Sequence, residues 1–174
     1  MPELPEVETV RRGLQPFLDG QKLKTVVLRR SGLRIPFPKD FSERLRGRTV
    51  NYLTRRAKYL LMHIEGGDVV IIHLGMSGTL HLISNRKKEK NTNLSFYHSK
   101  ILPNKHNHIK IKFHNCTIIY NDPRRFGFFK IFDNKKKLNK LFYKLGPEAI
   151  SKEFNFKYLK NKLLNKKKIL KTFC

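Results

Sequence analysis

Short apolar runs, separated by polar or glycine-containing segments, fill most of the first 133 residues. Runs of this length and spacing are typical of a β-sandwich or flattened barrel. Gly66-Gly67 predicts a tight hairpin turn between two of the runs, and Asn115 suits another. The expected strands are Leu23–Leu28, Thr49–Leu53, Tyr59–Ile64, Val69–Leu74, Thr79–Ile83, His108–Phe113, Thr117–Tyr120 and Phe128–Phe132.

The N-terminal segment has a different period. Its apolar residues recur at helical spacing and predict a helix from about Pro5 to Leu18, stopped by Gly20 and packed on the sheets. The residues that carry this period are Leu4, Val7, Val10, Leu14 and Phe17. The expected fold class is therefore α+β, mainly β, with two sheets and an N-terminal helix.

The pattern changes again after residue 133. A short helix around Leu138 to Leu145, ended by Gly146-Pro147, and another around Phe154 to Leu163 are expected. We therefore predict a β-sandwich domain over residues 1–133 and a helical segment over 134–174. Between the expected strands, Ser84–Lys105 is rich in Asn, Lys and Ser and is interpreted mostly as a surface loop.

The charge is strongly one-sided. Lysine and arginine number 38 against 13 acids, so the net charge is +25, which favours a polyanionic partner such as DNA, RNA or an acidic membrane. The alternative is an AT-rich coding sequence, because residues 134–174 hold 13 lysines and no arginine. Arginine is the more selective signal, and it occurs in pairs at Arg55-Arg56 and Arg124-Arg125.

Cysteine usage and hydropathy limit the setting. The two cysteines, Cys116 and Cys174, form neither a disulfide framework nor a Cys-x-x-Cys zinc motif. A reducing, cytoplasmic location is expected. The acidic N-terminus does not fit a signal peptide, and no apolar run approaches the length of a membrane span, so a membrane partner has little support.

Pro2 is the residue with the most unusual chemical potential. Removal of Met1 would make it an N-terminal secondary amine, a nucleophile that can attack the aldehyde carbon of an opened sugar and form an iminium. Glu3 and Glu6 are close enough in sequence to donate or accept protons beside it. The alternative is an ordinary helix start, with Pro5 in the first turn and acids near the positive end of the dipole.

Two further runs suggest phosphate or base contacts. Arg55-Arg56-Ala57-Lys58 places three cations before an apolar strand, where they would grip phosphates and Lys58 would also move a proton; a solvated strand end is the alternative. His106 and His108 alternate before another strand, so they would share a face. Two histidines alone make a weak metal site, and a phosphate contact by His106 or an ordinary surface histidine are equal alternatives.

Two glycine-containing turns could project residues into a duplex. Met76 lies between Gly75 and Gly78, and Arg124 and Phe126 lie in the run Asp122–Gly127. An apolar tip can act as a wedge between base pairs, and a guanidinium can read base edges. The alternatives are a methionine folded into the core and a phenyl ring buried beside an Asp–Arg pair.

These motifs together indicate chemistry on a displaced nucleotide. An amine nucleophile needs a sugar carbon at the aldehyde level, which DNA offers at C1′ once a base is lost. Reaching that carbon in a duplex requires the nucleotide to be turned out. Met76, Arg124 and Phe126 are suitable fillers for the resulting gap.

Residues 1–13 resemble the start of bacterial formamidopyrimidine-DNA glycosylase, also called 8-oxoguanine DNA glycosylase, and Leu4 favours it over the endonuclease VIII type. Five further blocks agree in order, and the resemblance extends to about Lys171. They are Arg55–Leu60, His73–Gly78, Lys105–His108, Asp122–Gly127 and Leu145–Glu148. It implies excision of oxidised purines from double-stranded DNA and strand cleavage at the abasic site by a monomeric, cytoplasmic, nucleoid-associated enzyme, with residues 1–133 as its catalytic domain.

The resemblance also implies roles for individual residues. Pro2 corresponds to the Schiff-base nucleophile, Glu3 to the acid that protonates the sugar, and Glu6 to a supporting carboxylate. Lys58 matches the lysine linked to lesion contact and proton donation. The positions that match DNA-binding or gap-filling residues, together with the neighbouring arginine, are His106, Lys166, Met76, Arg124, Arg125 and Phe126.

The main departure from the family is length. Family members continue into a helix-two-turn-helix module and a four-cysteine zinc finger, so the structural zinc would lie beyond this sequence and no cofactor is expected here. The chain is therefore interpreted as a truncated or fragmentary member. A catalytically weak or inactive DNA-binding remnant is the main alternative, and a basic RNA-binding module is the other.

Overall fold

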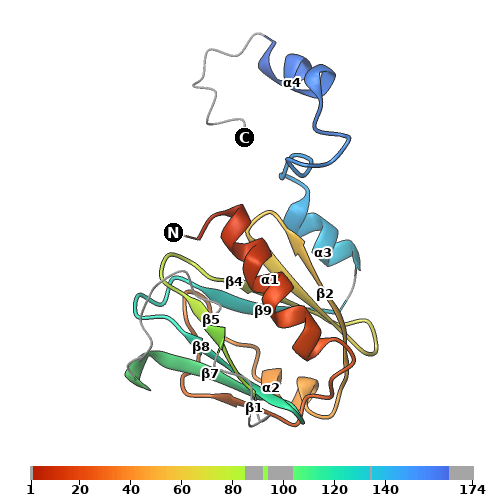
Figure 1. Cartoon of the computed structure of the whole chain (residues 1–174). Coiled ribbons are helices and arrows are strands. Elements are labelled where there is room, and N and C mark those ends of the chain that lie inside the picture. The colour runs from red at the N-terminus through yellow and green to blue at the C-terminus, as the bar shows by residue number, and fades with distance from the viewer. Residues whose placement is uncertain (1, 85–91, 94–103, 134, 165–174) are drawn as a thin grey trace.

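The computed structural model describes residues 2–84, 92–93, 104–133 and 135–164. Two antiparallel sheets pack into a sandwich, which confirms the mainly β fold expected from the sequence (Figure 1). One sheet has the order β1-β7-β8-β5-β6 and the other β2-β3-β4-β9. The strands are β1 Thr25–Leu28, β2 Val50–Arg56, β3 Tyr59–Ile64, β4 Val69–His73, β5 Thr79–Ser84, β6 Thr92–Asn93, β7 Asn107–Lys112, β8 Cys116–Asn121 and β9 Phe128–Phe132.

Strand β3 shows why the apolar runs are nearly continuous in this region. Leu60 and Met62 belong to the main core, which also contains Ile109 of the opposite sheet. Leu61 faces the other way and packs in a smaller cluster with Leu138. Since successive side chains alternate between faces, a strand buried on both sides is apolar at successive positions.

In the part of the chain that the structure describes, three α-helices complete the fold, together with a short one between β1 and β2. Helix α1, Leu4–Leu18, buries Val7, Val10 and Leu14 in the main core and runs across the sandwich (Figure 1). Helix α3, Lys135–Phe142, covers the outer face of the four-stranded sheet through Leu138. Helix α4, Phe156–Leu163, stands apart from the sandwich (Figure 1).

Helix α3 ends earlier than the sequence pattern suggested. The helix stops at Phe142, and the backbone turns there because the Leu145 amide donates to the Phe142 carbonyl at 2.9 Å. Pro147 disfavours helical backbone at Gly146, whose carbonyl accepts a hydrogen bond from Arg56 instead. The division at residue 133 stays a prediction.

Short elements were not expected from the sequence. Helix α2, Phe41–Leu45, and the 3₁₀ helix η1, Asn104–His106, are too short for a helical period to be recognised in their sequences. Strand β6 lies inside the stretch that we expected to be a loop. Residues 85–91 and 94–103 of that stretch lie outside the described residues.

The predicted turn at Gly66-Gly67 is confirmed. It joins antiparallel strands β3 and β4, and both glycines have positive φ, 83° and 91°, which explains why two glycines occupy these positions. Within the part of the chain that the structure describes, none of the helices has the length and apolarity to cross a membrane.

Candidate active site and exposed loops

The head of helix α1 places the predicted nucleophile at the surface. Pro2 is partly exposed and precedes the helix, which begins at Leu4. The Glu3 amide donates a hydrogen bond to Glu6 Oε2, so the Glu6 carboxylate holds the backbone beside Pro2. Because the helix dipole makes this end electropositive, it also favours nearby anions.

Lys58 reaches the same point from the turn between β2 and β3. Its Nζ lies 3.1 Å from Glu3 Oε2, and both side chains keep solvent contact, with 34% and 63% of their surfaces exposed. Three of the predicted groups, Glu3, Glu6 and Lys58, therefore lie together at the residue that follows Pro2. An ammonium and carboxylates beside a secondary amine can exchange protons with a reacting sugar.

A network of ion pairs behind this cluster joins three segments of the chain. Glu8 of α1 accepts from Arg55 Nε at 3.1 Å, and Arg55 Nη1 donates to Glu148 at 2.7 Å. The Glu148 carboxylate also accepts from the Ala57 amide at 2.6 Å. The Arg55 side chain is only 7% exposed, so this network is shielded from solvent.

The network shifts the titration of both acids. The Arg11 hydrogen bond, opposed by burial and reinforced by Arg12 and Arg55, lowers the pKa of Glu8 to about 2. Burial raises the pKa of Glu148, but hydrogen bonds from the Ala57 amide and from Arg55 and Arg56 outweigh it, so the net shift is downward. Both carboxylates are therefore fixed as anions near neutral pH.

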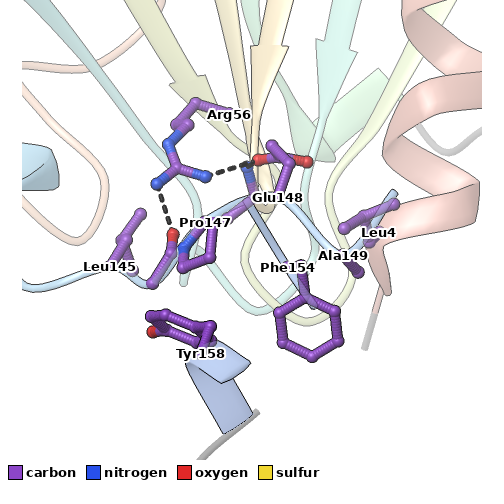
Figure 2. Close-up of a pocket in the computed structure, with 10 residues that line it drawn as sticks. Leu4, Arg56, Leu145, Pro147, Glu148, Ala149, Phe154 and Tyr158 are labelled. Carbon is purple, nitrogen blue, oxygen red and sulfur yellow. Dashed lines mark hydrogen bonds and ion pairs between the residues drawn. The ribbon is translucent and has the colours of Figure 1, made fainter. Parts of the chain in front are cut away.

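Arg56 attaches the Gly146–Glu148 segment to the turn that carries Lys58. Its guanidinium donates to Glu148 at 2.9 Å and to the Gly146 carbonyl, as Figure 2 shows. Ala57 has a φ of 49°, a strained value for a residue with a side chain. The Glu148 hydrogen bond to its amide stabilises this conformation in the residue that directly precedes Lys58. A small cavity adjoins the pair, lined also by Leu4, Leu145, Pro147, Ala149, Phe154 and Tyr158.

The predicted gap-filling residues lie on two exposed loops. Met76 is 37% exposed and Phe126 is 41% exposed, so neither folds back into the core. The Arg124 guanidinium lies 5.0 Å from the centre of the Phe126 ring, a distance typical of a cation–π contact. Arg125 is exposed beside them and has a φ of 58°.

Among the described residues, neither an ion pair nor a side-chain hydrogen bond joins Asp122 to Arg124 or Arg125. It is fully buried, and its carboxylate accepts hydrogen bonds from Ser77 Oγ at 2.6 Å and from the Gly127 amide at 2.9 Å. The alternative interpretation of this run, with one arginine paired to Asp122 and the phenyl ring buried, is therefore wrong on both counts, since Phe126 is exposed.

The two histidines do not share a face as expected. His106 belongs to η1 and is partly exposed, whereas His108 lies in β7 and is 1% exposed. His108 Nε2 lies 2.8 Å from the Asp122 carbonyl, so its ring supports the loop rather than facing a ligand. A shift in register between Asn107 and Ile109 breaks the alternation. Lys166 lies outside the described residues.

His73 was not assigned a role from the sequence, although it opens one of the family-like blocks. Its Nδ1 accepts a hydrogen bond from the Gly75 amide at 3.0 Å, and its ring stacks on Phe128 with a centroid distance of 5.4 Å. Burial, followed by the charges of Arg34 and Lys58, lowers its pKa. His73 is therefore a neutral support under the loop that begins at Gly75.

Residues 2–84, 92–93, 104–133 and 135–164 contain no candidate metal site. No group of three or more His, Cys, Asp or Glu side chains in that part of the chain could hold a metal ion. Cys116 is buried in the core. The family's four-cysteine zinc site, which the resemblance places beyond this sequence, stays a prediction.

Fold and site together define a class of protein: a two-sheet sandwich whose first helix is preceded by a partly exposed proline and by a glutamate paired with a lysine. The family model for the formamidopyrimidine-DNA glycosylase N-terminal domain matches residues 1–129. The chain belongs to this family.

Relatives and solved structures agree with this assignment. The formamidopyrimidine-DNA glycosylase of Rhodopseudomonas palustris (strain BisA53) is 44% identical over 173 residues, which cover 98% of this chain and 58% of the relative. That of Agrobacterium fabrum is 40% identical, covering 99% and 59%. The Lactococcus lactis Fpg in complex with abasic-site DNA has a TM-score of 0.81 and 29% identity, over 99% of this chain and 60% of that one. The chain thus spans a little under three fifths of the curated relatives' length.

Proposed function

We propose that this chain acts in base-excision repair, removing oxidised purines from duplex DNA and cleaving the strand at abasic sites through a Schiff base on Pro2. The observation that carries the proposal is the Lys58–Glu3 ion pair at 3.1 Å beside the exposed head of helix α1. Family membership and the abasic-site DNA bound by the Lactococcus lactis protein support the choice of substrate.

The lyase reaction needs an amine and groups that move protons. The Pro2 nitrogen, unblocked by removal of Met1, bonds to C1′ of the opened sugar, and the C1′ oxygen leaves as water to give an iminium. Loss of a C2′ proton then expels the 3′ phosphate by β-elimination. Lys58 and Glu3 are the groups assigned to proton transfer, and Glu6 holds the backbone beside them.

Base excision requires two more contributions. Glu3 is assigned to protonate the sugar as the damaged base leaves while Pro2 attacks C1′. Met76, Arg124 and Phe126 are assigned to fill the gap left by the displaced nucleotide, which is consistent with their exposure. His106, Arg125 and Lys166 are assigned to bind the DNA backbone. We place this activity in a monomer in the bacterial cytoplasm, at the nucleoid.

Borohydride trapping tests the proposal. The 174-residue chain, with Met1 removal verified by mass spectrometry, should form a covalent adduct with abasic-site duplex, and Pro2→Gly should trap poorly. Pro5→Ala is the matched control, because it removes a proline from the same helix start and leaves the terminal amine. No adduct at any protein concentration, with duplex binding retained, would favour a DNA-binding protein without lyase chemistry.

A further inference from the structure

The loops that carry Met76 and Phe126 are in direct backbone contact. A Cβ atom added to Gly75 would lie 2.4 Å from the Gly127 nitrogen and 2.4 Å from the Phe126 carbonyl carbon. No side chain fits in that space, and Gly75 also has a φ of 68°. The backbones of the two loops are therefore in close contact at Gly75, with no room for a side chain between them.

One buried carboxylate connects these loops. Asp122 Oδ1 accepts from Ser77 Oγ at 2.6 Å and from the Arg124 amide at 3.2 Å, while Oδ2 accepts from the Gly127 amide at 2.9 Å. The Tyr120 hydroxyl donates to Oδ2 from strand β8 at 3.1 Å. Ser77 belongs to the Met76 loop and the two amides to the Phe126 loop, so the Ser77 bond links the two loops directly. Two weaker contacts add to it: the Arg124 amide donates to Ser77 Oγ at 3.2 Å, and the Tyr120 hydroxyl lies 3.3 Å from the Leu74 carbonyl.

We propose that Ser77 and Asp122 are positioning residues that latch the two loops, so that Met76 and Phe126 enter the DNA gap as one rigid wedge. The inference rests on the proposed function, since it requires insertion into DNA. Ordering two independent loops during binding would cost conformational entropy twice. A latch already formed in the free protein removes most of that cost, and it makes the contributions of the two tips interdependent.

A double-mutant cycle tests this interdependence. Binding of a duplex with a stable abasic-site analogue opposite dC is measured for Met76→Ala, Phe126→Ala and the double variant, in both Ser77 and Ser77→Ala backgrounds. With Ser77, the fold-loss of affinity in the double variant should be about tenfold smaller than the product of the fold-losses in the two single variants. With Ser77→Ala, that discrepancy should fall to about twofold or less. Ser77→Thr, which restores the hydroxyl, should recover the coupling.

Thr79→Val is the control, because it removes a buried hydroxyl from strand β5 that contacts His81 and the Asn121 carbonyl, and leaves the bonds to Asp122 in place. It should lower the melting temperature without abolishing the coupling. Should Ser77→Ala fail to fold, Ser77→Cys keeps the size and weakens the hydrogen bond. Equal coupling in both backgrounds, or none with Ser77 intact, would overturn the latch. A chain that binds intact and abasic duplex equally would instead overturn the proposed function, and the latch with it.

Discussion

Lys58 Nζ lies 3.1 Å from Glu3 Oε2, and this ion pair joins the turn between two strands to the head of helix α1. Both partners keep solvent contact, so the pair itself adds little stability. Its value is positional, because it holds an ammonium group at Glu3, the residue that follows Pro2.

Lys58→Ala should therefore lower the rate of borohydride trapping by about 100-fold, the usual scale for losing a general acid–base group. Lys58→Arg keeps the positive charge but cannot release a proton at neutral pH, so DNA binding should be retained while the rate stays low. Lys39→Ala, which removes an exposed lysine before helix α2, controls for net charge. Equal losses for Lys39→Ala and Lys58→Ala would contradict a specific role.

Glu148→Gln should loosen the turn that directs Lys58. The variant loses the anion that accepts from Arg55 and from the Ala57 amide, and leaves Glu8 as the carboxylate partner of the nearly buried Arg55 guanidinium. Losing hydrogen bonds to a charged group costs about 2 kcal/mol in the free energy of unfolding, measurable by urea titration. The trapping rate should also fall about tenfold while the dissociation constant for duplex DNA changes little.

The matched control is Glu153→Gln, which neutralises an exposed carboxylate in the same segment. It should leave the free energy of unfolding and the trapping rate near their wild-type values. If Glu148→Gln behaved like Glu153→Gln, the network would not position Lys58.

Acid should remove the contribution of Glu8 to stability. Its pKa is lowered from 4.5 to about 2 in the folded chain, so the folded state binds its proton less readily than the unfolded state does. The stabilisation is fully present above about pH 4.5 and is lost as the pH falls towards 2. The difference in free energy of unfolding between wild type and Glu8→Gln should therefore shrink over this range. Urea titrations at several pH values measure it, and a constant difference would show that Glu8 is not stabilised by its arginines.

Local sequence patterns were sufficient for the strands other than β6 and for the helix over residues 4–18, because period and turn chemistry are local properties. They could not reveal the partners that support the site. Arg55 and Glu148 are 93 positions apart, and Ser77 and Asp122 are 45 apart. Such contacts depend on how the sheets and loops pack. From the sequence, Asp122 was expected only to begin its loop or to pair with a neighbouring arginine. In the structure its buried carboxylate accepts hydrogen bonds from both loops.

Arg124 should determine the preference for the base opposite the abasic site. Its guanidinium lies 5.0 Å from the centre of the exposed Phe126 ring, so it is presented at the tip of the loop where a base edge would be met. Arg124→Ala should reduce the preference for dC over dA, dG and dT about tenfold, the scale of one base-specific contact. Binding titrations with the four opposing bases measure this ratio.

Arg125→Ala is the matched comparison, because it removes the neighbouring exposed arginine of the same loop. As a backbone contact, Arg125 should contribute equally for all four bases, and its loss should reduce the salt dependence of binding by about one counterion. An Arg124→Ala variant that weakened binding equally for all four bases would assign Arg124 to the phosphates as well.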